Sequence, residues 1–147
     1  MTRVVAVETE GVRIAVSRDR VRRVAEHVLR AERVREALVS ITFVSDRRIA
    51  ALNARHLRHR GPTDVISFGF APVGRVGAVV GDVYIAPEVA RRNARAHRQG
   101  IREELLRLVV HGVLHVLGHD HPVSDARYTS PMWRRQERLL RAALAAA

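Results

Sequence analysis

The sequence contains no cysteine and no lysine, and it has no long uncharged hydrophobic run. The lack of cysteine excludes disulfides and thiolate metal sites, and it fits a reducing, cytoplasmic environment. No segment approaches the roughly 18 uncharged apolar residues of a membrane span, so we expect no membrane partner. The first residues lack the apolar core and the small-residue cleavage site of a signal peptide, and we expect no such peptide.

Charge of one sign dominates the chain. All 26 basic residues are arginine, against 15 acidic residues, which gives a formal net charge of +11. This excess favours a polyanionic partner, most readily nucleic acid bound through its phosphates. A nucleotide-composition bias of the genome is the alternative; it explains arginine in place of lysine, but less readily the excess of positive charge. With 147 residues, 47% of them apolar, the chain can form one globular core, and we expect a single domain over residues 1–147.

Hydrophobic periodicity predicts short strands and helices that alternate along the chain. Expected strands cover 12–16, 38–44, 65–70 and 82–86; expected helices cover 18–34, 47–57, 88–99, 102–117 and 132–144. Three closely spaced turn formers in 71–80 indicate a loop. The last helix carries its apolar stripe at positions 132, 136, 139, 140 and 144. This mixture predicts an α+β or an α/β fold.

The segment HGVLHVLGHDH, residues 111–121, holds half of the eight histidines. It follows the apolar run LLRLVV, which predicts a helix buried on most sides. His111 and His115 are four residues apart and therefore share one helix face. Gly118 permits a left-handed turn that returns His121 to the same point. Three neutral nitrogens with one open position are typical of a catalytic zinc site, whereas the alternative is a set of packed or capping histidines. Three imidazoles also suit nickel, copper or iron.

The spacing of these histidines equals that of the metzincin proteases, H-E-x-x-H-x-x-G-x-x-H. Met132 also follows, where those enzymes have a methionine turn. Gly112 stands at the position of the glutamate that deprotonates the metal-bound water in such a protease. Because glycine transfers no proton, the sequence argues against a protease.

The chain as a whole resembles the YbeY-type endoribonucleases, which are bacterial rRNA maturation factors. The family signature H-G-x-L-H-L-x-G-[YH]-D-H appears as HGVLHVLGHDH, with valine in place of the middle leucine. Further matches are ITFVSDRRIAALN (41–53), PTDVISF (62–68), GDVYIAPEVA (81–90) and ELLRLVVHG (104–112). The resemblance covers most of residues 38–121.

This resemblance implies a metal-dependent, single-strand-specific endoribonuclease that acts in 16S rRNA 3′-end processing and ribosome quality control. The implied fold is α+β, a small mixed sheet of about four strands packed with about five helices. The metal site would lie at the end of a central buried helix, with His111, His115 and His121 holding one Zn²⁺ per chain. The implied partners are single-stranded RNA, ribosomal RNA and the small ribosomal subunit, in the cytoplasm.

The sequence departs from the family at an arginine four residues after the asparagine of its L-N motif. This chain has Leu57 there, flanked by Arg58 and Arg60. Either arginine could reach the same phosphate, because arginine combines a long stem with a bidentate guanidinium. The alternative is that both are solvated loop charges.

Other candidates concern the end of the histidine motif and one predicted helix. Asp120 could orient a ligand imidazole or cap the turn, and an exposed His119 could contact RNA or donate a proton. Spacing on the predicted helix 88–99 aligns Arg91, Arg95 and Arg98 on one face, either as phosphate contacts or as an ordinary solvated face.

Three functions therefore compete. The first is a zinc-dependent endoribonuclease. The second is a ribosome-assembly factor that binds RNA and whose metal is mainly structural. The third, a metalloprotease, is disfavoured by Gly112.

Overall fold

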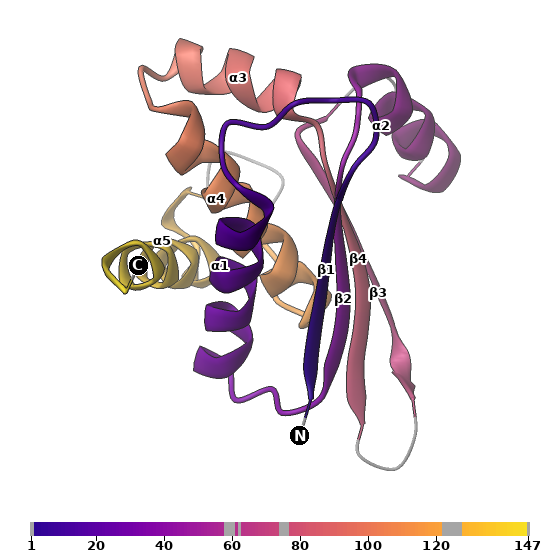
Figure 1. The fold of residues 1–147 in the computed structure, drawn as a ribbon, viewed down its shortest axis with the longest axis vertical. Coiled ribbons are helices and arrows are strands. Elements are labelled where there is room, and N and C mark those ends of the chain that lie inside the picture. Colours follow the sequence, from indigo (N-terminus) through magenta and orange to yellow (C-terminus); the bar gives the residue numbers. More distant parts are fainter. Residues whose placement is uncertain (1, 58–60, 62, 74–76, 122–127, 147) are drawn as a thin grey trace.

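The computed structural model describes residues 2–57, 61, 63–73, 77–121 and 128–146. Within these residues a four-stranded sheet is packed with five α-helices (Figure 1). The strands are β1 (Arg3–Thr9), β2 (Ala37–Phe43), β3 (Val65–Val73) and β4 (Ala78–Ile85). The helices are α1 (Arg18–Ala31), α2 (Asp46–Leu52), α3 (Pro87–Ala96), α4 (Ile101–Val116) and α5 (Pro131–Ala145), and the π-helical segment η1 (Asn53–Leu57) continues α2. The predicted α+β class is confirmed.

The sheet is mixed, in the order β1-β2-β4-β3. β1, β2 and β4 run parallel to one another, whereas β3 is antiparallel to β4. Alternate residues of β2, from Ala37 to Phe43, are buried against the helices. This period of two is the expected pattern for a strand whose two faces have different surroundings.

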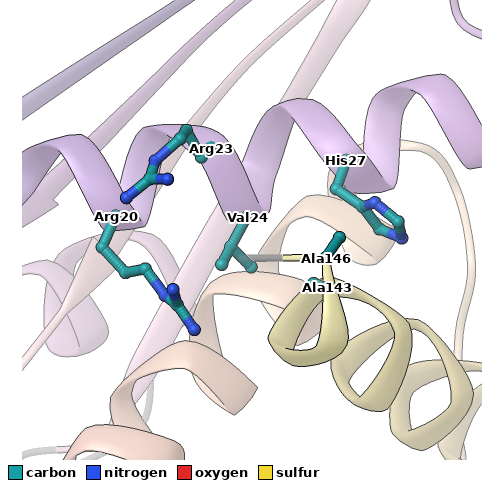
Figure 2. A pocket seen from close by; sticks show the side chains of 6 residues that line it. All are labelled: Arg20, Arg23, Val24, His27, Ala143 and Ala146. Carbon is teal, nitrogen blue, oxygen red and sulfur yellow. The ribbon is translucent and has the colours of Figure 1, made fainter.

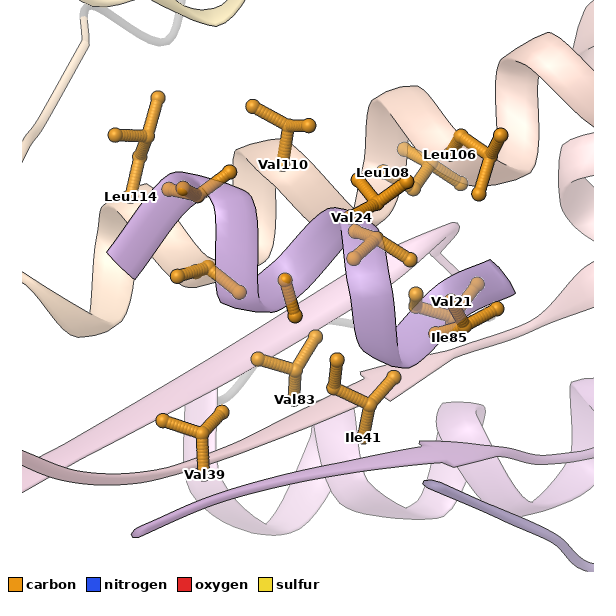
Figure 3. Packing of buried hydrophobic residues seen from close by; sticks show 14 of the residues in the cluster. Val21, Val24, Val39, Ile41, Val83, Ile85, Leu106, Leu108, Val110 and Leu114 are labelled. Carbon is orange, nitrogen blue, oxygen red and sulfur yellow. The ribbon is translucent and has the colours of Figure 1, made fainter. Parts of the chain in front are cut away.

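The core lies between the sheet and helices α1 and α4 (Figure 3). In that view Val21 and Val24 of α1 lie between the sheet residues Ile41 and Val83 and the α4 side chains above them. On the other face of the sheet, α2 covers a smaller cluster in which Ile49 packs with Ile66. α4 is therefore the central helix of the larger layer, and it carries the histidine motif.

Serine side chains begin three of the helices. Ser17, Ser45 and Ser130 each accept a hydrogen bond from the backbone N–H three residues later, at 3.0–3.2 Å. Such caps satisfy donors that a helix leaves unpaired at its first turn. Ser130, followed by Pro131, fixes the start of α5.

The prediction of a loop over 71–80 is wrong at both ends, because β3 extends to Val73 and β4 begins at Ala78. The glycines inside the two strands, Gly69 and Gly81, lie outside that range and have a packing cause. A Cβ on Gly81 would lie 2.4 Å from a Val116 methyl, and one on Gly69 would lie 3.1 Å from the Val116 carbonyl oxygen. These glycines make room for the end of α4 on the sheet.

The predicted strand at 12–16 is also wrong. The first strand is β1, at residues 3–9, and it pairs with β2 over its whole length. Residues 12–16 have no strand structure, yet Val12, Ile14 and Val16 pack against the core. Alternating apolar residues can thus be buried by an irregular segment as well as by a strand.

Among the described residues, no helix has both the length and the apolar character that crossing a membrane requires.

Candidate metal centre

The last two turns of α4 place two imidazoles side by side. His111 and His115 are separated by one turn, and their ring centroids lie 4.6 Å apart at an interplanar angle of 77°. The helix is otherwise apolar here, with Val109, Val110 and Leu114 buried. The two histidines are half-buried, so their rings lie at the border between the core and solvent.

A glycine turn brings a third imidazole to the same place. Gly118 has a φ of +99°, a conformation that favours glycine, and it ends α4 as predicted. His121 then returns, with ring centroids 5.1 Å from His111 and 5.0 Å from His115. One nitrogen from each of the three rings lies within 4.8 Å of the others. The three histidines therefore converge as the spacing predicts, in an arrangement that could hold one metal ion.

A buried glutamine orients one of these rings. Gln136 of α5 is only 1% exposed, and its Oε1 lies 2.6 Å from His111 Nδ1. Gln136 Nε2 donates to Glu137 Oε2 at 3.0 Å, so the amide oxygen faces the imidazole. Because an amide oxygen only accepts, Nδ1 of His111 carries the proton and Nε2 keeps its lone pair for a ligand. A hydrogen bond of this kind on the far nitrogen is a regular feature of metal-binding histidines.

Behind the glutamine, an ion-pair network joins α5 to the first half of α4. Arg107 donates to both carboxylate oxygens of Glu137, at 2.9 and 3.1 Å. It also donates to Glu104 at 2.9 Å and to Gln99 at 2.7 Å. Burial alone would lower the pKa of Arg107, but hydrogen bonds to Glu137 and Glu104 outweigh it and raise that pKa. Arg107 thus stays charged and fixes Glu137, which in turn fixes the amide of Gln136.

Sequence reasoning missed both Gln136 and Arg107. Hydrophobic periodicity places position 136 in the apolar stripe of the last helix, although the residue is a glutamine. A polar side chain on the buried face of an amphipathic helix needs a hydrogen-bond partner. A glutamine on this buried face is the signal in the sequence, because it predicts that a polar group of another element faces residue 136.

His115 is poised as a neutral ligand. Burial, followed by the neighbouring charges of His111 and His121, lowers its pKa to about 4. Near neutral pH this imidazole is therefore neutral, and one of its two nitrogens carries no proton. No proton has to leave that nitrogen when a cation binds.

The two other polar residues of the motif have local partners. The Asp120 carboxylate accepts a hydrogen bond from the His121 N–H at 2.8 Å, which corresponds to the capping role of the two considered. His119 is half-buried rather than exposed, with Nε2 2.6 Å from Glu32 Oε1. Glu32 also pairs with Arg135. Burial raises the pKa of Glu32, but hydrogen bonds from Arg135 and His119 outweigh it and lower that pKa. His119 thus ties the end of the motif to the end of α1.

Gly112 lies against the sheet. A Cβ at this position would come within 2.5 Å of a Val83 methyl, and Ser67 Oγ donates to the Gly112 carbonyl at 3.0 Å. A glutamate here, as in the metzincins, would require the Val83 side chain to shift. The close packing at Gly112 thus agrees with the argument against a protease base.

The candidate arginines fall in two groups. Arg58 and Arg60 lie outside the described residues. Arg91 and Arg95 lie on α3, as predicted, but Arg98 does not, because α3 ends at Ala96 and Arg98 has a φ of +53°. The predicted three-residue face on this helix is therefore wrong at its third member. Arg91 Nε lies 3.6 Å from Glu88.

The fold and the converging imidazoles define a small α+β protein with a candidate metal centre at the end of its central helix. A family model described as Endoribonuclease YbeY matches residues 6–143. The endoribonuclease YbeY of Syntrophus aciditrophicus is 30% identical over 143 residues, which cover 95% of this chain and 89% of the relative. That of Chloroherpeton thalassium is 33% identical over 124 residues, 84% of each chain.

The likeness extends to a solved structure. The solution structure of a Thermotoga maritima protein superposes with a TM-score of 0.63 at 24% identity, covering 97% of this chain and 91% of that one. At this identity the match speaks for the fold, and the sequence matches speak for the family. The chain belongs to the endoribonuclease YbeY family.

Proposed function

We propose that this protein is a zinc-dependent, single-strand-specific endoribonuclease that acts in 16S rRNA 3′-end maturation and ribosome quality control. The observation that carries the proposal is the convergence of His111, His115 and His121 in a chain of this family. The orientation of His111 by Gln136 supports it, because the hydrogen bond at Nδ1 leaves the lone pair of Nε2 for a metal ion. The net charge of +11 supports an RNA substrate.

The donor set fits a zinc ion with one open position. Three neutral nitrogens would hold the ion, and His115 is already deprotonated near neutral pH. When bound, zinc supplies a Lewis acid that polarises the phosphate and lowers the pKa of its bound water. Gln136 keeps His111 in the binding tautomer, and Asp120 holds the turn that presents His121.

Arginine side chains would neutralise the negative charge of the RNA phosphates. We propose Arg58 or Arg60 for the arginine that the family places at the position of Leu57, with Asp120 as a further catalytic candidate. Arg91 and Arg95 are candidates for contacts to more distant phosphates, and Arg98 would reach RNA only from beyond the end of α3. The partners would be ribosomal RNA and the small ribosomal subunit, in the cytoplasm.

One experiment separates an enzyme from an RNA-binding assembly factor with a structural metal. The purified protein is analysed for metal and then incubated with single-stranded and duplex RNA, with and without chelator, while circular dichroism follows the fold. We expect about one zinc per chain, and chelator should stop the cleavage of single strands without unfolding the protein. Unfolding on chelation would favour the structural metal. Absence of cleavage by the zinc-loaded protein would contradict the proposal.

A second experiment tests the arginine. If Arg58 or Arg60 replaces the family arginine, changing that residue to alanine should slow cleavage by roughly 10²-fold, the scale for losing one charge-stabilising donor. Changing Arg18 or Arg20, near the start of α1, should do little. Equal small losses from all four substitutions would mean that neither candidate has this role.

A further inference from the structure

Helix α5 carries a second feature besides the glutamine that supports the metal centre. Its outer face presents three exposed arginines, Arg134, Arg138 and Arg141, at positions i, i+4 and i+7. This spacing aligns them along one side of the helix over about 10 Å. They line a groove of about 660 Å³ together with Pro131, Trp133 and Glu137.

The side chains of these three arginines have no acidic partner among the described residues. Within those ranges, no side-chain hydrogen bond or ion pair involves any of them, whereas Arg91 and Arg107 each face a carboxylate. Glu137 is the one acid that lines the groove, and both of its oxygens already accept from Arg107. Among the described residues, the positive charge of the groove is therefore uncompensated, as a site for an external anion requires.

The groove lies next to the candidate metal centre. Trp133 lines the groove and also lines the small cavity formed by His111, His121 and Gln136. It is half-buried, and its ring contacts Tyr128 edge-on at a centroid distance of 4.9 Å. Trp133 therefore separates the imidazoles from the arginines of α5 by a single side chain.

A second hollow that Trp133 lines has the opposite character. It contains the carboxylates Asp64, Glu104 and Glu137, and its arginine, Arg107, is held by two of these acids. A phosphate would be repelled there. The charges on the two sides of Trp133 thus favour one path for a polyanion.

We propose that the groove of Trp133, Arg134, Arg138 and Arg141 binds the phosphates of a single RNA strand that extends from the metal centre. This inference rests on the proposed function and adds the path of the substrate. Arginine suits the role, because its planar guanidinium binds phosphate through two parallel hydrogen bonds and stays charged. An extended strand can place more than one phosphate along the row.

Another basic hollow provides a contrast. Arg20, Arg23 and His27 of α1 surround a small pocket at the far end of α5, against Ala143 and Ala146 (Figure 2). Arg23 is paired with Asp19, and the pocket lies at the opposite end of α5 from Trp133. Arg13, Arg18 and Arg20, before or in the first turn of α1 and without an ion pair among the described residues, make a matched control for the arginines of α5.

The test uses Trp133, the single tryptophan of the chain, as its reporter. A 2′-O-methylated octauridylate is titrated into the zinc-loaded protein while tryptophan fluorescence is followed, and a gel afterwards checks that the oligonucleotide is intact. The titration is repeated from low to high salt. The variants are R134A/R138A/R141A and the control R13A/R18A/R20A, which removes the same charge from residues without ion pairs among those described. Circular dichroism verifies that each variant is folded.

We expect binding to change the fluorescence of the natural protein and to weaken steeply with salt. The α5 variant should bind at least tenfold more weakly. Its slope of log affinity against log salt should fall by about 2, since each lost phosphate contact on a single strand removes about 0.7. The control should lose much less. Equal losses in the two variants would overturn the groove while leaving RNA binding intact, whereas no binding by the natural protein would contradict the proposed function itself.

Discussion

Helices α3 and α5 both carry arginines at helical spacing, yet their surroundings differ. On α3, Arg91 faces Glu88, and Arg92 is paired with Asp46 at 2.9 Å. On α5, the outer row has no such partners in the part of the chain that the structure describes, and the inner face of the same helix reaches the imidazoles through Gln136. α3 contributes no residue to the cavity beside His111 and His121. The comparison teaches that spacing alone does not distinguish a binding row from a solvated face; the acidic partners and the neighbouring site do.

The comparison of α3 with α5 depends first on whether the three imidazoles bind a metal. Testing this has the largest expected effect. Replacing His111 or His115 with alanine should remove most of the bound metal, because two ligands remain of three. Metal content of the purified variants is the measurement. His119→Ala is the matched control, since His119 belongs to the same motif but pairs with Glu32, and it should keep its metal. Full metal occupancy in both ligand variants would show that these histidines do not bind the metal. The arginines of α5 would then no longer lie beside a metal centre.

The inner face of α5 is tested by Gln136→Met. This change keeps the volume but removes the acceptor for His111 Nδ1, so the ring loses its fixed tautomer and orientation. We expect zinc affinity, measured by chelator competition, to fall about 10- to 100-fold, the range for losing such a partner. Met132→Leu, one turn earlier on the same buried face, should leave zinc affinity nearly unchanged. Equal zinc affinity in the two variants would show that Gln136 only fills space.

The sequence predicted the central helix and the convergence of its histidines well, because both follow from local rules. The four-residue spacing of His111 and His115, and the left-handed turn at Gly118, need no knowledge of the rest of the chain. The predicted helix starts at 47 and 88 also lie within one residue of the starts of α2 and α3, since caps and proline act on neighbouring residues.

What failed depends on contacts between distant residues. The turn formers of 71–80 suggested a loop, although β3 and β4 pair as far as Val73 and Ala78. Gln136 looked like part of an apolar stripe, and its partner lies 25 residues away on another helix. The apolar residues at 12–16 suggested a strand, although the backbone bonds of β2 are taken by β1 and β4. At each of these positions, contacts between residues distant in the sequence determine the local structure. The sequence alone does not show those contacts.

The smallest expected effect is on α3, and it sharpens the comparison directly. The double variant R91A/R95A removes the two arginines that share a face of this helix, of which Arg91 is already near a carboxylate. Exposed pairs of this kind contribute about 0–1 kcal/mol, so the fold should be unaffected. We expect single-strand affinity to fall by about twofold or less at moderate salt, because only the general positive field of the protein is reduced. The matched variant R134A/R138A removes the same charge from α5 and should cost several times more. A loss in R91A/R95A as large as in R134A/R138A would place α3 on the RNA path as well, and the two helices would then differ only in their support of the metal centre.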